Sequence, residues 1–139
     1  MKHPYYLAPG QPRRASVPLI QVVYKNRFKN TTPILALLDS GAAVSFAPLD
    51  LALWLGIKVD NKKYLEIRGF NNSVTKCYPG ITTIEIDGRD IEIPIYFGGT
   101  SNMQCIIGQD PFFDKAKILF ERYDNSFSIE WTGQKMRSN

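Results

Sequence analysis

An aspartate at the end of an apolar run is the residue of this chain best placed to do chemistry. Residues 34–46 read ILALLDSGAAVSF, in which the apolar run ends at Asp39 and Ser40-Gly41 follow. A carboxylate beside a buried strand costs free energy unless it is hydrogen-bonded, hydrated or used in a reaction. Gly41 permits a tight loop that another backbone can approach closely. By itself the tripeptide is also a common turn, in which the Asp side chain accepts a bond from a nearby backbone N–H.

The composition leaves carboxylates as the leading candidates for any catalysis. The chain of 139 residues has a single histidine, His3, in a segment that we expect to be frayed. Ser-His-Asp and Cys-His mechanisms both need a well-placed imidazole inside the fold. Cys77 and Cys105 lack the CxxC spacing of a zinc site, which favours two structural thiols. We therefore expect no metal and no cofactor.

The charge and hydropathy of the chain limit the kinds of partner that we expect. The net charge is +4 and the isoelectric point about 9.1, but the 17 Lys and Arg residues are spread along the whole chain. Without a basic stripe we expect no nucleic-acid binding, although the charge favours acidic partners. No apolar stretch approaches the roughly 20 residues that span a bilayer, and the N-terminus does not resemble a secretory signal. The sequence thus predicts a cytoplasmic protein with no membrane association.

Short strands and one or two small helices are predicted to position Asp39. The segment ILALL, bounded by Pro33 and Asp39, is predicted to be a fully buried strand. The segment 47–57 switches to helical spacing, with Leu51, Trp54 and Leu55 at i, i+3 and i+4 and Gly56 as its C-terminal cap. Its apolar residues predict an amphipathic helix of about two turns.

The second half of the chain is predicted to be mostly β. The segment 64–70 resumes β structure, and residues 74–97 predict two or three strands with a hairpin turn at Asp87-Gly88. A short buried run follows in MQCIIGQD, and PFFDKAK is predicted to form one helical turn. The final segment 117–131 predicts two strands around Asp124-Asn125-Ser126. This pattern of close-spaced strands favours a barrel or sandwich.

The domain organisation follows from the same pattern. We expect an extended lead-in over residues 1–16, a single folded domain over residues 17–131 and a polar tail over residues 132–139. In the final hairpin, Phe127 and Trp131 are candidates either for dimer anchors or for a cap on the domain's own core.

Three segments form an ordered set along the chain. They are LLDSGAAVSF (37–46), IRGFNNSVTKCYPGITTIEIDG (67–88) and CIIGQD (105–110). In this order they resemble the retroviral-type aspartic proteases, the retropepsins and their retrotransposon relatives. The first is similar to that family's apolar-apolar-Asp-Thr/Ser-Gly-Ala motif, the second to its flap hairpin and following strands, and the third to its apolar-apolar-Gly-x-Asp/Asn segment. The resemblance covers roughly residues 17–120.

The resemblance implies a mainly β fold, a closed or partly open barrel of the retropepsin type with one or two short helices, acting as a homodimer. Each chain supplies one Asp39, so two chains are needed for the pair of carboxylates that aspartic proteolysis requires. The pair shares one proton, activates a water and hydrolyses a peptide bond of a peptide or protein substrate. The alternative that the sequence leaves open is a catalytically inactive retropepsin-like dimerisation or peptide-binding module.

The resemblance also implies roles for the residues around Asp39. The Ser40 hydroxyl is expected to hydrogen-bond across the dimer, Gly41 to admit substrate backbone, and Ala42 to complete the loop. The flap tip is expected at Gly69, Phe70, Asn71 and Asn72, where a plain surface hairpin is the alternative. The residues expected beneath the loop are Ile106, Ile107 and Gly108, of which Ile106 is the better candidate for a substrate pocket and both isoleucines fit an ordinary core equally well.

Some positions depart from the retroviral pattern. Many members carry acidic residues just after the motif and an Arg after the later Gly, where this chain has Ala43, Val44 and Gln109. Both sides of that ion pair are absent together, which leaves an apolar rim and suggests a preference for bulky apolar substrate side chains. Ala42 cannot donate a hydrogen bond to the carboxylate pair, so we expect activity to reach mildly acidic or near-neutral pH.

Overall fold

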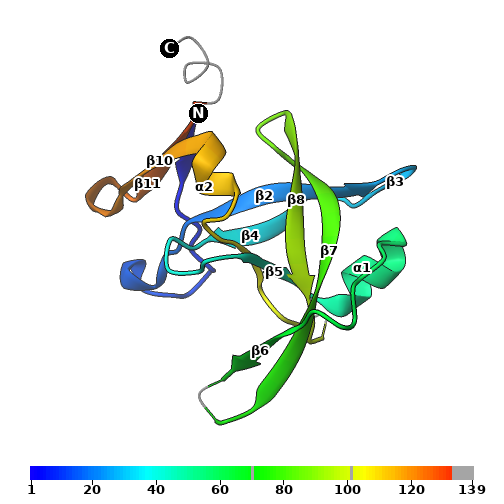
Figure 1. The fold of residues 1–139 in the computed structure, drawn as a ribbon. Coiled ribbons are helices and arrows are strands. Elements are labelled where there is room, and N and C mark those ends of the chain that lie inside the picture. The colour runs from blue at the N-terminus through cyan, green and yellow to red at the C-terminus, as the bar shows by residue number, and fades with distance from the viewer. Residues whose placement is uncertain (70, 101, 133–139) are drawn as a thin grey trace.

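A computed structural model describes residues 1–69, 71–100 and 102–132 of the chain. These residues form mostly strands, with two short helices and two 3-10 turns, as Figure 1 shows. The first half contains β1 (Lys2–Pro4), η1 (Arg13–Ala15), β2 (Leu19–Asn26), β3 (Lys29–Asn30), β4 (Ile34–Leu38), β5 (Ser45–Ala47) and α1 (Leu49–Leu55). The second half contains β6 (Leu65–Arg68), β7 (Val74–Ile86), β8 (Arg89–Phe97), β9 (Cys105–Ile107), α2 (Phe112–Lys115), β10 (Ala116–Glu121), η2 (Arg122–Asp124) and β11 (Ser126–Trp131).

The larger sheet closes on itself as a barrel. Its strand order is β3-β2-β4-β9-β5-β8-β7-β6. An additional pairing of β2 with β7 closes the six strands between β3 and β6 into a ring. The barrel thus runs β2-β4-β9-β5-β8-β7, while β3 and β6 extend from its rim. The predicted turn at Asp87-Gly88 is confirmed, because both residues have positive φ, 53° and 76°, as a tight hairpin turn requires. The expectation of a mainly β barrel with short helices is confirmed.

Strand β9 lies between the two strands that flank Asp39. It pairs in parallel with β4, where Leu38 is opposite Ile107, and antiparallel with β5, where Phe46 is opposite Ile106. A strand from the far part of the chain is thereby inserted between β4 and β5. The loop that joins β4 to β5 consequently has β9 and its following loop directly alongside it.

The core fills the barrel and continues under the smaller sheet. Side chains of alternate strand residues point inward, as the period of two along a strand requires. Among the largest fully buried side chains are Tyr24, Ile84, Ile95, Phe97 and Ile107. The smaller sheet, ordered β1-β11-β10, contributes Phe127 and Ile129 to the same cluster. Phe127 therefore caps the core of its own chain, and Trp131 packs edge-on against buried Phe112.

The N-terminal segment differs from the expectation of a frayed lead-in. Strand β1 pairs with β11, with His3 opposite Phe127, and Tyr6 forms a bridge with Val17. The imidazole of His3 lies 2.9 Å from the Asp87 carboxylate and stacks on the Phe127 ring. A sequence pattern that looks irregular becomes ordered here because a partner strand is available at the end of the chain.

Two details of burial also correct the sequence-based expectations. The strand β4 is not fully buried, because Leu35 is 37% exposed and only Ala36 and Leu38 point into the core. In α1 the inward residues are Ala52 and Leu55, whereas Trp54 is 53% exposed. The helix itself is confirmed, and Gly56 ends it in the left-handed conformation at φ 71°. Among the described residues, no helix is long and apolar enough to cross a membrane.

Candidate active site

Asp39 is held at the end of β4 by two backbone hydrogen bonds. Its N–H donates to the Ile107 carbonyl of β9 at 3.0 Å, which extends the β4–β9 pairing by one residue. Its carboxylate oxygen Oδ1 accepts the Gly41 N–H at 2.9 Å. Asp39 is partly buried, so its carboxylate combines a fixed position with access from outside. Backbone groups therefore fix both the main chain and the carboxylate of Asp39.

The loop after β9 is hydrogen-bonded to the loop that follows Asp39. The backbone N–H of Gln109 donates to the Ala42 carbonyl at 2.8 Å, and the N–H of Asp110 donates to the Ala43 carbonyl at 2.9 Å. The side-chain amide of Gln109 donates to the Ser40 carbonyl. The two loops are thus joined by consecutive hydrogen bonds, and the predicted proximity of 39–42 to 106–108 is present in the fold.

Gly108 is required by the closeness of these two loops. A Cβ atom at this residue would lie 2.2 Å from the Val44 carbonyl oxygen and 2.7 Å from that of Ala42. Both neighbours are backbone atoms, which cannot rotate away as a side chain can. The Gly108 N–H donates to the hydroxyl of Ser45 at 3.0 Å, and Ser45 is fully buried. Close packing here places one loop directly beneath the other.

The two isoleucines of β9 point in opposite directions. Ile107 is fully buried in the core, whereas Ile106 is only partly buried. Alternation along the strand accounts for this difference. Ile107 is therefore core, and Ile106 is the member of the pair with access to the surface.

The proposed flap is a hairpin that extends beyond the barrel. Strands β6 and β7 pair from Leu65–Cys77 to Arg68–Val74, and Figure 1 shows this hairpin projecting away from the barrel. Its tip contains an N–H···O bond from Gly69 to Ser73 at 2.9 Å, and Asn72 adopts a positive φ of 65°. Asn71 accepts the Ser73 N–H at 3.2 Å through its side chain. Phe70, the remaining predicted tip residue, lies outside the described residues.

Burial shapes the chemistry of the thiol at the start of β9. Burial raises the pKa of Cys105 above its ordinary value, and the hydroxyl of Tyr24 lowers it by a smaller amount. Burial likewise raises the pKa of Tyr24 well above its ordinary value. The pKa of Cys77 is also raised by burial. All three groups are therefore neutral near pH 7, and the interpretation of the cysteines as free buried thiols agrees with this environment.

Two residues beyond those predicted from the sequence support the site. Gln109 was considered only as a replacement for Arg, yet its amide joins the two loops. Ser45 was overlooked, although it is a polar residue at an inward position of a short strand, which is the pattern expected of a buried hydrogen-bond partner. Within the residues described, no cluster of three or more His, Cys, Asp or Glu side chains is arranged to hold a metal ion.

Comparisons with known proteins support the fold of the chain and no finer assignment. No protein-family model matches the chain, and no curated protein matches it. Among solved structures it is similar to the EIAV protease in complex with the inhibitor HBY-793, with a TM-score of 0.51 and 20% sequence identity. The alignment covers 78% of this chain and 93% of that chain. At this identity the likeness shows a retropepsin-like fold.

Proposed function

We propose that this chain is an aspartic endopeptidase whose catalytic pair consists of two Asp39 carboxylates, one from each subunit of a homodimer. The observation that carries the proposal is the geometry of the Asp39 loop. A backbone-anchored carboxylate follows a barrel strand, and a Gly-containing loop from the other half of the chain is packed beneath it. The fold likeness to a retroviral protease supports the same reading.

The proposed chemistry needs only carboxylates and water. Two carboxylates about 3 Å apart cannot both ionise, so the pair holds one proton. The ionised member takes a proton from water while the water oxygen bonds to the scissile carbonyl carbon, and the protonated member donates to the carbonyl oxygen. Collapse of the tetrahedral intermediate breaks the C–N bond: the departing nitrogen receives a proton from the pair, and a hydroxyl of the intermediate returns one to the pair, which restores the shared proton. No step requires a metal or an imidazole.

The neighbouring elements are assigned supporting roles. Ser40 is exposed, so its hydroxyl is free to face a second chain, and Gly41 leaves space beside the carboxylate. Ile106 offers a partly exposed apolar surface for a substrate side chain. The β6–β7 hairpin closes over bound peptide and excludes water.

Substitution of Asp39 by Asn tests the enzyme. Wild-type protein and Asp39→Asn are incubated with a mixed peptide library, products are identified by mass spectrometry, and the molecular mass of both is measured by sedimentation. We expect cleavage by wild type, no cleavage by Asp39→Asn, and a dimer in both. Absence of cleavage by a wild-type dimer between about pH 4 and pH 7 would instead favour the alternative, a non-catalytic dimerisation or peptide-binding module.

The same library tests the proposed substrate preference. The positions of the retroviral ion pair are occupied by Ala43, Val44 and Gln109, and the Gln109 amide is engaged with the Ser40 carbonyl. These positions therefore carry no charge, and bulky apolar residues are expected on both sides of the cleaved bond. A preference for charged flanking residues would contradict this assignment.

A further inference from the structure

A second surface lies on the side of the barrel away from the Asp39 loop. Figure 1 shows α1 and β3 at the right and the loop between β4 and β5 at the left. Between the β2–β3 turn and the C-terminal end of α1 is an open groove of about 720 Å³. None of the residues proposed for catalysis lines it. We call this surface the turn–helix groove, defined by residues 26–29, 55–58 and Ile81.

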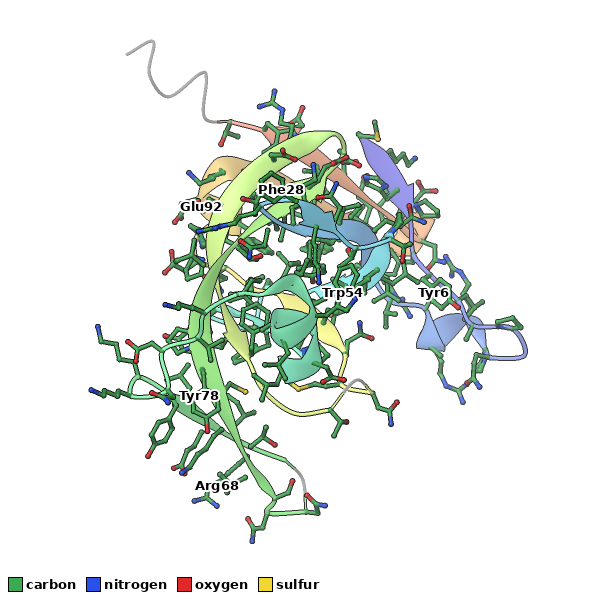
Figure 2. All side chains as sticks on the ribbon, turned by 90° about the vertical axis from the view of Figure 1, so that its right-hand side faces the viewer. Tyr6, Phe28, Trp54, Arg68, Tyr78 and Glu92 are labelled. Atoms are coloured by element: carbon green, nitrogen blue, oxygen red, sulfur yellow. The ribbon has the colours of Figure 1, made fainter. Side chains whose placement is uncertain are left out.

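Apolar side chains form the floor and walls of the turn–helix groove. Leu55 and Ile57 are buried and form its base. Phe28 is 100% exposed at the tip of the turn, and Ile81 of β7 is 56% exposed. Figure 2 faces this side of the molecule and labels Phe28 and the exposed Trp54 of α1. Single exposed apolar residues are common, but Phe28 and Ile81 border the same depression, which favours an interaction site.

The turn that carries Phe28 is fixed in place. Arg27 adopts a positive φ of 50°, a conformation that costs free energy in a non-glycine residue. Hydrogen bonds to the end of α1 hold the turn there: the Asn26 side-chain amide donates to Leu55 O at 2.9 Å, and Lys29 Nζ donates to Trp54 O at 2.9 Å. Lys29 Nζ also lies 5.0 Å from the centre of the Trp54 ring. A preorganised surface binds with a smaller loss of conformational entropy.

All the charged side chains that line the turn–helix groove are positive. Arg27, Lys29 and Lys58 line it, and no Asp or Glu does. In the described part of the chain, none of the three forms an ion pair. Lys25, which precedes the turn in β2, does form ion pairs, because its ammonium lies 2.7 Å from the Glu85 carboxylate and 3.0 Å from that of Asp90. Arg27 and Lys58 therefore remain available to a partner, and Lys29, which donates to the Trp54 carbonyl, has no carboxylate beside it among the described residues.

We propose that the turn–helix groove binds an acidic segment of a partner protein, with one apolar side chain of that segment packed against Phe28 and the floor. Carboxylates of the segment pair with Arg27 and Lys58 at the rim, and the positive charge of Lys29 favours them further. A peptide fits better than nucleic acid because the cations surround an apolar depression and do not form a stripe along which phosphates could run. It fits better than a membrane because Leu55 and Ile57 lie at the base of a depression, where a side chain can reach them and a flat bilayer surface cannot.

Fluorescence anisotropy with defined peptides tests the proposal. The probe is a labelled dodecapeptide rich in Glu and Asp with one central Leu; matched probes replace the acids by Gln and Asn or the Leu by Ser. The full chain carrying Asp39→Asn is used beside wild type so that cleavage cannot consume the probe. We expect saturable binding of the acidic Leu peptide to both, weaker binding of each matched probe, and weakening between about 50 mM and about 200 mM salt.

Two substitutions with matched controls locate the binding site. Phe28→Ala is expected to weaken binding about tenfold, because truncation of an exposed anchor removes a contact and leaves the fold intact. Lys58→Glu is expected to weaken it comparably. The controls are Tyr123→Ala and Lys117→Glu, exposed residues of η2 and β10 that should bind as wild type.

Several outcomes would overturn the proposal. They are absence of saturable binding by the acidic Leu peptide, equal binding of its neutral version, or unchanged binding by Phe28→Ala. Tighter binding to phosphatidylserine vesicles or to a DNA duplex, lost in Phe28→Ala, would assign the groove to a membrane or nucleic acid. A change of oligomeric state in Phe28→Ala would assign it to a second copy. All of these are independent of catalysis, since the binding assay needs no reaction at Asp39.

Discussion

At the scale of single residues, the Asp39 carboxylate takes its position from backbone groups. Its own N–H is bonded to Ile107 and its Oδ1 accepts the Gly41 N–H, so neither contact depends on the identity of a side chain. Side chains can vary around such a site while the acid keeps its place. The uncharged residues Ala43, Val44 and Gln109 are therefore compatible with the observed position of Asp39.

Ala42 is the residue through which the pH dependence of the proposed reaction can be tested. A serine at this position could donate a hydrogen bond to the carboxylate pair and favour its ionised form. Ala42→Ser is therefore expected to shift the pH–rate profile to the acid side by roughly one pH unit. The profile is measured with a fixed peptide substrate, and Ala43→Ser, an exposed neighbour, is the control. An unchanged or alkaline-shifted profile would contradict the mechanism.

Gly108 is expected to be more sensitive to substitution than Gly41. A methyl group at Gly108 meets backbone atoms at 2.2 Å and 2.7 Å, so the two loops must separate. Gly108→Ala should lower the free energy of unfolding by about 1–3 kcal/mol, as overpacking does. At Gly41 the nearest atom to an added Cβ is Asp39 Oδ1 at 3.2 Å, so Gly41→Ala should have a much smaller effect. Urea denaturation of both variants measures the difference; equal midpoints would show that the loops can separate without cost.

At the scale of elements, β1 joins the start of the chain to its end. It pairs with β11, and His3 reaches the turn between β7 and β8 through Asp87. Both side chains of this pair are largely buried, at 19% and 10% exposure. The contact of His3 with Asp87 in this way connects the smaller sheet to the barrel.

Removal of β1 tests the contribution of this strand. Deletion of residues 1–4 removes the pairing with β11 and uncovers Phe127, so the free energy of unfolding should fall by about 1–3 kcal/mol. His3→Ala keeps the backbone pairing and removes only the imidazole contacts, and it should cost less. Urea denaturation distinguishes the two variants. A deletion variant as stable as wild type would show that β1 contributes nothing to the folded chain.

Local patterns predicted the elements better than they predicted their partners. The Asp87-Gly88 turn, the helix ending at Gly56 and the short run before Gly108 carry strong local signals, and the structure contains each of them. The pairing of β1 with β11 has no local signal, because a segment such as Lys2-His3-Pro4 becomes a strand only when another strand lies beside it. The contact of the exposed Trp54 ring with Lys29 likewise joins the helix to a residue from a distant turn. Helical spacing alone cannot reveal it.

The candidate site was predictable to the extent that its motifs are contiguous. The segment 39–42 and the segment 106–108 were both identified, and the structure brings them together. The hydrogen bond from Gln109 to the Ser40 carbonyl was not identified, because it depends on the distance between two loops. The same is true of the Ser45 hydroxyl beneath Gly108.

At the scale of the whole molecule, the proposal requires two chains, and mixing experiments can count them. An equal mixture of wild type and Asp39→Asn, left to exchange subunits, should contain about one quarter fully wild-type dimers. The activity should therefore fall to about a quarter of that of the same total amount of wild type, whereas a site made by one chain would retain about half.

The control for this mixture is Asp50→Asn, which changes an exposed acid of α1 outside the proposed site. Mixing it with wild type should leave the activity unchanged. Retention of half the activity in the Asp39→Asn mixture, after subunit exchange is complete, would reject the shared pair of carboxylates.

The insertion of β9 between β4 and β5 has a consequence for the order of events during synthesis. Asp39 leaves the ribosome well before its support at Ile107 exists. At roughly 5–20 residues per second, the nascent loop waits on the order of several seconds for that strand. Non-local pairings of this kind also close slowly. A newborn chain therefore carries its key acid in an unformed loop, and any reaction at Asp39 is delayed until translation has passed the second half of the barrel.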